Sequence, residues 1–143
     1  MNTIHTICNP LIRRGIDLCH LYRHAAAAVN EPGLRTVLEE DAQTLAAVIA
    51  ELQHEVAQAG GEPRLRGSWR ALLRCRLVAT MAHASARRDS AWIHALAQDE
   101  AALLRAFEQA LAGVPENFAK VLHRQLPRLR GIHLDMHDLI GST

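Results

Sequence analysis

Residues 89–111 read DSAWIHALAQDEAALLRAFEQAL, and the spacing of their hydrophobic residues decides the fold. These residues recur at steps of three and four, which is the spacing of one face of an α-helix. The positions on this face are Ile93, Leu96, Ala97, Glu100, Leu104, Phe107 and Leu111. A carboxylate, Glu100, therefore stands in the middle of a face that should be buried. Because burying an unpaired carboxylate is costly, Glu100 must either find polar partners or take up a proton.

The same spacing continues on both sides of this stretch and predicts an all-α protein. We expect four long helices at about 4–29, 32–59, 89–112 and 115–140, and one further helix at about 68–87. Four long helices with one crossover helix between the second and the third describe a four-helix bundle with one long connection. This is the ferritin-like arrangement.

Several residues mark the expected helix ends. Asn9-Pro10 is a capping pair, so the first helix either begins at Pro10 or begins earlier and bends there. Ser68 is the expected N-cap of the crossover helix, and Asp89 or Ser90 that of the helix after it. Pro127 lies inside the last helix and predicts a kink.

Length and composition fit a single domain, residues 1–143. Apolar residues make up 49% of the chain and aromatic residues only 3%, which favours packed helices over a sheet. No apolar run approaches the roughly 20 residues that cross a bilayer, and the N-terminus lacks the pattern of a signal peptide. Three cysteines without CxxC spacing, Cys8, Cys19 and Cys75, indicate reduced thiols. We therefore predict a cytoplasmic location and no membrane partner.

Charge is distributed unevenly, although the net charge is only +1. Residues 31–62 hold seven acids and one arginine, whereas residues 64–88 hold seven arginines and no acid. Our first interpretation is that the basic helix lies across the acidic one. The alternative is a surface for an acidic partner, made of Arg64, Arg66, Arg70, Arg74, Arg76, Arg87 and Arg88. We do not expect nucleic acid as the partner, because no aromatic residues interleave with these arginines.

Short motifs along the chain resemble a known family. They are Gly15-Ile16-Asp17, Glu51-Leu52, Gly60-Gly61-Glu62-Pro63 with Gly67-Ser68, Glu100 to Leu111, and Gln125 with His133. Together they resemble the small bacterial ferritin-like proteins catalogued as domain of unknown function 2383. The resemblance implies a ferritin-like four-helix fold and self-association as a homodimer or higher homo-oligomer, but no established activity. The chain departs from the family pattern at Leu45, Ala97 and Leu134, where a basic residue, a glutamate and an aspartate are usual.

A di-metal site in such a bundle requires a Glu from each of two helices and a Glu-x-x-His from each of the other two. This chain has a single Glu-x-x-His, Glu51 to His54, and both residues point away from the apolar face of their helix. Asp17 likewise points away from the apolar face of the first helix. The complete ligand set is therefore absent, and we expect no cofactor.

Two polar groups should nevertheless lie inside the bundle. Counting residues outward from the turns places Glu100 near Gln125, and Asp41 near Tyr22 and His133. One interpretation is a hydrogen-bonded pair at each place, with Gln125 donating to Glu100 and with His133 or Tyr22 donating to Asp41. The other is a degenerate iron or manganese site formed by Asp41, Glu100 and His133.

Two classes of function follow from these alternatives. The first is a non-catalytic, self-associating interaction module or stress-related structural module, which the missing ligands favour. The second is a metal-binding or metal-oxidising protein, which the internal carboxylates favour. A third and weaker alternative is an anion or nucleic-acid binder that uses the arginine-rich helix. Trp69 should pack the crossover helix or a second subunit, and Arg74 and Arg76 could lower the pKa of the Cys75 thiol.

Overall fold

The computed structural model describes residues 3–142, and the predicted domain boundary at 1–143 includes three terminal residues outside this range. Five α-helices account for nearly all of the described chain. They are α1 (Thr3–Ala28), α2 (Pro32–Gln58), α3 (Trp69–Ala84), α4 (Arg88–Gly113) and α5 (Glu116–Ser142). The all-α prediction is confirmed, and each expected helix is present within a few residues of its predicted bounds. None of the helices in this range combines the length and the apolar character that spanning a bilayer requires.

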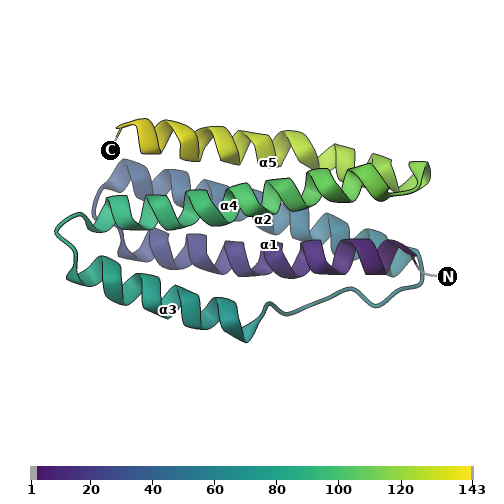
Figure 1. The fold of residues 1–143 in the computed structure, drawn as a ribbon, viewed down its shortest axis with the longest axis horizontal. Helices are drawn as coiled ribbons and strands as arrows, with labels where there is room; N and C mark the ends of the chain where they lie inside the picture. The colour runs from purple at the N-terminus through teal and green to yellow at the C-terminus, as the bar shows by residue number, and fades with distance from the viewer. Residues whose placement is uncertain (1–2, 143) are drawn as a thin grey trace.

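The four long helices lie side by side, and the shorter α3 lies outside them (Figure 1). A short turn joins α1 to α2 and another joins α4 to α5, so each of these pairs is antiparallel. The segment after α2 returns along the outside of α1 before α3 begins. The long return path carries the chain back to the end where α2 started, so that α2 and α4 run in the same direction (Figure 1).

Apolar stripes from the four long helices meet in one core. In the stripe predicted at 93–111, Ala97 and Leu111 are partly buried and the other residues are buried. Buried residues on the other three long helices include Ile4, Cys8, Leu11, Cys19, Leu38, Leu52, Leu122 and Leu129. The largest fully buried side chains include Tyr22 on α1, Leu45 on α2, Trp92 on α4 and Met136 on α5. Burial on this scale supplies the main stabilisation of a domain of this size.

Two helix starts need comment. Helix α1 begins at Thr3 and continues through Pro10, so the earlier of the two predicted starts is confirmed, and Asn9 is not its cap. The Asn9 side chain instead holds the segment after α2, donating to the Glu62 carbonyl at 3.0 Å and accepting from the Arg64 amide at 2.9 Å. The N-cap of α4 is Arg87 rather than Asp89 or Ser90. The carboxylate of Asp89 is used elsewhere, because it accepts the backbone amides of Asn30 and Glu31 in the α1–α2 turn.

Other helix ends match the prediction. Pro32 occupies the first turn of α2, and the Glu31 side chain caps that turn by accepting the amides of Gly33 and Leu34. Ser68 is the N-cap of α3, with its hydroxyl accepting the Ala71 amide at 3.1 Å. Helix α5 continues through Pro127, and the kink expected there stays a prediction.

The position of α3 corrects the first interpretation of the charge pattern. Helix α3 packs on α1 and α4 rather than across the acidic helix α2. Its start is fixed by Asp17 of α1, whose carboxylate accepts both the amide and the hydroxyl of Ser68. Gly67 makes this contact possible, because a Cβ atom there would lie 2.0 Å from the Asp17 Oδ1 atom. The arginines of α3 are therefore not neutralised by α2.

Candidate functional site

The first candidate region is the polar cluster inside the bundle, with Glu100 at its centre. Glu100 is only 3% exposed, and one of its oxygens lies 2.7 Å from His133 Nδ1 on α5. Burial raises the pKa of the Glu100 carboxyl, and the hydrogen bond from His133 together with its positive charge when protonated opposes that rise. The His133 side chain is 44% exposed, so the imidazole connects a buried carboxylate to solvent.

Glu100 and Gln125, predicted to pair, do not. Gln125 donates to Glu51 on α2, and Arg128 donates to the same carboxylate at 3.1 Å. These two contacts lower the Glu51 pKa, and Glu51 is therefore not on the purely solvated face that we predicted. His54, its partner in the Glu-x-x-His motif, is exposed as expected.

The shift of about two helical turns between the predicted partner, Gln125, and the observed partner, His133, has a simple cause. Side chains on a helix lean toward the N-terminus of that helix. Helices α4 and α5 are antiparallel, so Glu100 and His133 lean toward each other along the bundle axis although their backbones are offset. Counting from the turn compares backbone levels only, and it missed this pair for that reason.

Asp41 on α2 forms the second part of the cluster. Asp41 is buried, and its pKa is raised to about 8, chiefly by burial and then by a hydrogen bond with the carboxyl of Asp135 on α5. A hydrogen bond between two carboxyl groups requires one of them to hold a proton. The predicted hydrogen-bond donors are not used: Tyr22 makes no hydrogen bond through its hydroxyl within residues 3–142, and His133 is paired with Glu100.

Tyr22 interacts electrostatically with both parts of the polar cluster, with Glu100 in the first and with Asp41 and Asp135 in the second. Burial raises the pKa of the Tyr22 phenol well above its usual value, and the charges of Asp41, Glu100 and Asp135 raise it further. In the described part of the chain, three buried side-chain oxygens of this cluster have no hydrogen-bond partner: Tyr22 Oη, Asp41 Oδ2 and Glu100 Oε1. They come from α1, α2 and α4 respectively. Such orphaned groups are rare in a protein interior and each is costly.

The residues of the polar cluster are candidates for a metal site. Oxygen donors with one histidine are a plausible set for iron or manganese. However, within residues 3–142 no three His, Cys, Asp or Glu side chains are grouped so that they could hold a metal ion. The residues fit the chemistry of such a site but not its geometry, and the assignment of Asp41, Glu100 and His133 as ligands stays a prediction.

The second candidate region is the outer face of α3, which the sequence analysis did not identify as apolar. The large hydrophobic residues of this segment point outward and are more than half exposed, whereas the residues facing the bundle are mostly small. The outward set is Leu65, Trp69, Leu72, Leu73, Leu77 and Met81, and the inward set is Ala71, Cys75, Val78, Ala79 and Ala82. We call the outward set the α3 stripe. Exposed apolar groups gathered on one helix face mark an interaction surface.

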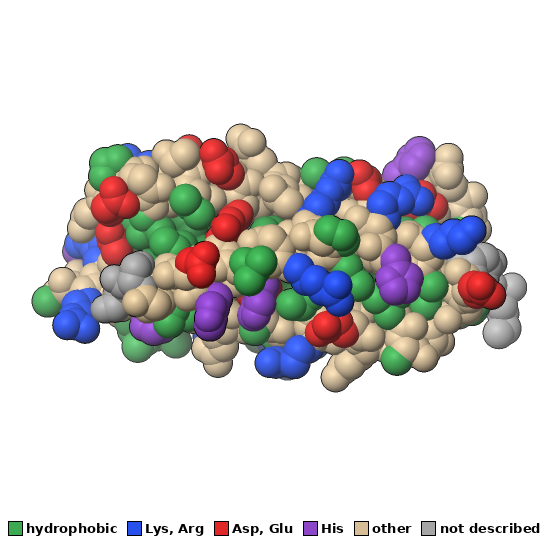
Figure 2. All heavy atoms as spheres, turned by 90° about the horizontal axis from the view of Figure 1, so that it is seen from above, with side chains coloured by type: hydrophobic (Ala, Val, Ile, Leu, Met, Phe, Trp, Pro, Cys, Tyr) green, Lys and Arg blue, Asp and Glu red, His purple; other side chains and the backbone are tan. Residues whose placement is uncertain are grey.

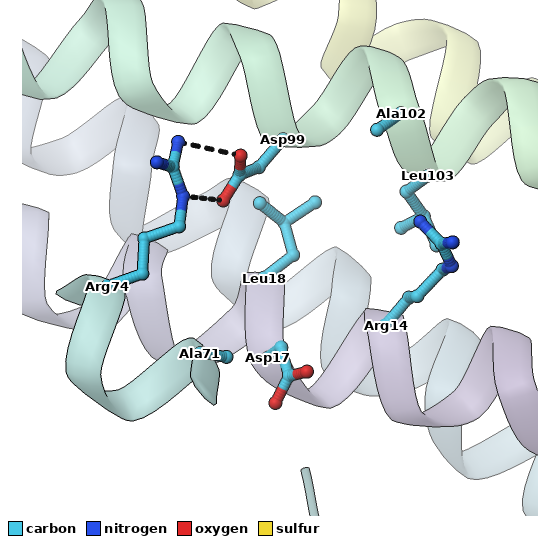
Figure 3. A pocket seen from close by; sticks show the side chains of 8 residues that line it. All are labelled: Arg14, Asp17, Leu18, Ala71, Arg74, Asp99, Ala102 and Leu103. Atoms are coloured by element: carbon cyan, nitrogen blue, oxygen red, sulfur yellow. Dashed lines mark hydrogen bonds and ion pairs between the residues drawn. The ribbon is translucent and has the colours of Figure 1, made fainter. Parts of the chain in front are cut away.

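Arginines border the α3 stripe. Arg74 is tied to α4 by two hydrogen bonds to Asp99, at 2.9 and 3.1 Å, beside a small hollow that Arg14 and Leu18 also line (Figure 3). Of the arginines in α3, only Arg74 forms an ion pair within the described range. Arg70 stacks over the Trp69 ring, 5.6 Å from its centroid. The border is therefore basic and largely uncompensated.

A basic hollow adjoins the start of the stripe. It has a volume of about 530 Å³, and α1 and the segment before α3 form its walls. Four arginines line it together with the single acid Asp17: Arg13, Arg14, Arg64 and Arg70. Asp17 is already engaged by Ser68, so the hollow favours a negatively charged group.

The opposite side of the molecule has the opposite character. Figure 2 shows the face formed mainly by α5, where acidic and histidine side chains gather toward the end at which α5 finishes. Leu134, Asp135 and Asp138 are exposed near that end of α5. The small net charge of the chain therefore hides a basic side at α3 and an acidic area on α5.

The cysteines do not form a site. All three are buried and free. Burial raises the pKa of each thiol, to about 11 at Cys8, so the expectation that Arg74 and Arg76 lower the pKa of Cys75 is wrong. The reason is geometric: Cys75 faces the bundle, whereas Arg76 is exposed and Arg74 points to Asp99.

Comparison with known proteins gives one match. A family model described as Domain of unknown function (DUF2383) matches residues 3–113. The chain belongs to this family. The match to DUF2383 ends with the last residue of α4, so Gln125, His133 and Asp135 of α5 lie beyond it. No curated protein matches the chain, and no solved structure does.

Proposed function

We propose that this DUF2383 protein is a non-catalytic interaction module that binds an acidic partner through the α3 stripe and its arginine border. The observation that carries the proposal is the orientation of α3. A helix that only completed a core would turn its leucines inward, whereas this one exposes Leu72, Leu73 and Leu77 and buries alanines. Exposing them is unfavourable in water, and a partner that covers them removes that penalty.

Charge decides the kind of partner. Residues 64–88 contain seven arginines and no acid, and α3 does not use the acids of α2. A partner that brought positive charge to this face would be repelled, and one that brought negative charge would be attracted and oriented. An anionic surface with apolar groups of its own therefore fits both parts of the face.

Crosslinking from matched positions tests the proposal. A photo-reactive amino acid is placed at position 77 or, as the control, at position 134; both leucines are 60% exposed, but they lie on α3 and α5 respectively. We expect crosslinked products in cells from position 77 and none from position 134. Equal yields from the two positions, or none from either, would overturn the proposal.

We also propose that the bundle is ferritin-like. The parallel direction of α2 and α4, produced by the long return path, supports this assignment. Self-association belongs to the same proposal. A second copy could offer acids to the arginines of α3 from its α2 or its α5, and either choice gives a head-to-tail contact rather than a two-fold one. Sedimentation velocity at low and high salt tests it, because a head-to-tail assembly held by charge should dissociate as salt rises.

A metal-binding function is the second candidate. The observation in its favour is the convergence of three unpartnered oxygens on the buried cluster, from Tyr22, Asp41 and Glu100. Elemental analysis of protein purified without a metal-affinity tag, followed by calorimetric titration with Fe(II) and Mn(II), tests it. Stoichiometric binding that is lost in Glu100→Gln and Asp41→Asn would establish a metal site. Absence of binding in the folded protein would reject this candidate.

A further inference from the structure

We propose that the acidic partner of α3 is the surface of an anionic phospholipid bilayer, on which α3 lies with its axis in the plane of the membrane. This inference rests on the proposed function, since it names the partner of the same face. The absence of a spanning segment led us to expect no membrane partner, but a helix that lies in the interface needs no such segment.

The α3 stripe has the shape that a fluid interface accepts. Trp69, Leu73, Leu77 and Met81 follow one another at steps of four and lie on one side of the helix. Helix α3 is also the outermost layer of the molecule, so its outer face meets no other part of the chain (Figure 1). The stripe is uneven, because a hollow of about 470 Å³ lies among Trp69, Leu72, Leu73 and Arg76. Fluid lipid chains can fill such a hollow, whereas a rigid partner needs a shape that matches it.

The polar border has the composition that an anionic headgroup layer selects. Arg66 is exposed before α3, and Arg70 and Arg76 are exposed among the residues of the stripe. Their long side chains can reach phosphates while the leucines enter the acyl boundary. Trp69 is 66% exposed at the start of the helix, and tryptophan prefers the boundary between headgroups and hydrocarbon. An apolar helix face that lies on a membrane is buried by ~5–10 Å.

The basic hollow gives the headgroups a defined place. Arg13, Arg14, Arg64 and Arg70 line it at the end of the stripe where Leu65 and Trp69 are exposed. A lipid next to this end of the stripe would therefore place its phosphate at or near these guanidinium groups. Planar guanidinium groups bind phosphate through paired hydrogen bonds.

Two other partners fit this face less well. A second copy presenting its own α3 would bring two arginine-rich borders together without any acid between them, which is repulsive. Single-stranded nucleic acid is bound by rows of aromatic side chains, but the α3 stripe contains one tryptophan among aliphatic residues.

Vesicle co-sedimentation of the full chain tests the inference. The probes are vesicles of phosphatidylcholine alone and vesicles of phosphatidylcholine and phosphatidylglycerol in equal parts. We expect binding only to the anionic vesicles, weaker binding at high salt, and a blue shift of tryptophan emission on binding. The shift should disappear in Trp69→Phe, because the other tryptophan, Trp92, is buried in the bundle.

Matched variants test whether the contact with the membrane lies on α3. Leu77→Glu should weaken binding about tenfold or more, while Leu134→Glu, equally exposed on α5, should leave it unchanged. Arg76→Glu should also weaken binding, and Lys120→Glu, which changes the net charge equally from α5, should do so much less. Circular dichroism establishes that the variants are folded, as expected for exposed positions.

The possible failures are distinguishable. If the wild-type chain does not bind anionic vesicles, or if Leu77→Glu and Leu134→Glu bind equally, the lipid inference is wrong. If position 77 then still crosslinks to a protein and position 134 does not, the proposed function stands with a protein partner. If positions 77 and 134 crosslink alike, both proposals fail.

Discussion

The interior of the bundle and the outer face of α3 depart from the usual distribution of residues in opposite ways. The interior contains Glu100 and Asp41, which an ordinary core excludes, and the α3 face exposes leucines, which an ordinary core would bury. The interior accommodates its acids by raising their pKa values and by pairing Glu100 with His133. Within residues 3–142 the α3 face has no comparable compensation. The interior is compensated in part, since Tyr22 Oη, Asp41 Oδ2 and Glu100 Oε1 have no hydrogen-bond partner in that range, whereas the exposed leucines of α3 call for a partner.

The largest expected difference is in the free energy of unfolding, when one leucine in each of the two regions is replaced by alanine. Leu52 on α2 is 1% exposed, and Leu52→Ala should lower the free energy of unfolding by about 2–5 kcal/mol, because it leaves a cavity. Leu77→Ala should change it by less than about 0.5 kcal/mol, as is usual for surface positions. Urea denaturation of both variants measures the difference. Similar losses would show that α3 is part of the core.

The next effect concerns the pH dependence of stability. The Asp41 carboxyl has a pKa of about 8 in the folded chain against 3.8 when unperturbed, so the folded state binds more protons between these values. Stability from this group is therefore fully present below pH 3.8 and is lost as the pH rises toward 8, by an amount on the order of a few kcal/mol.

Asp41→Asn tests that pH dependence, because it leaves a neutral side chain of similar size. We expect the fall in stability between these pH values to become much smaller in the variant. The groups whose charges act on Asp41 are Glu40, Glu100 and Asp135, all of which remain. Denaturation curves at several pH values give the measurement, and an unchanged pH dependence would assign the effect to another group.

A smaller effect tests how α3 is attached. Gly67→Ala would place a Cβ atom 2.0 Å from Asp17 Oδ1, so the hydrogen bonds from Ser68 to Asp17 must loosen. We expect a loss of about 1–3 kcal/mol, because a partly buried hydrogen-bond network is disturbed. Gly131→Ala is the matched control, since nothing lies near its Cβ position and alanine favours a helix by up to about 1 kcal/mol. A gain in both variants would contradict the contact at Gly67.

The smallest effect concerns the ion pair between α3 and α4. Arg74 and Asp99 are partly exposed, and water screens such pairs, so Arg74→Ala should lower stability by less than about 1 kcal/mol. Because the pair is screened, the loss should shrink further at high salt. A loss as large as that of a core leucine would show that this ion pair is a main attachment of α3.

The helices could be predicted from the sequence because helical spacing involves only residues close together in the chain. Spacing at three and four residues placed all five, and it marked Glu100, Asp41 and Gln125 as the internal polar residues, all of which are buried. Partners were harder to predict, because they depend on the offset between helices and on the lean of side chains. The prediction paired Glu100 with Gln125, whereas the structure pairs it with His133.

The spacing of its residues could not predict which face of α3 turns toward the bundle. Its leucines and its alanines both recur at helical intervals, so either set could have faced the bundle. In the structure Ala82 and Cys75 are the residues buried against the bundle, where α3 packs on α1 and α4. These contacts are made with residues distant in the sequence. Asp135 was missed for a related reason, because it lies outside the apolar stripe of α5.

The small inner face of α3 has a consequence for local unfolding. Because α3 is attached chiefly through Cys75, Ala82 and the contacts at its two ends, it gives up little buried area when it detaches. Its amide hydrogens should therefore exchange with solvent through an opening that leaves the four long helices intact, at a lower free energy than global unfolding. The return path and α3 would then behave as a separate cooperative unit, whose opening a bound partner would suppress.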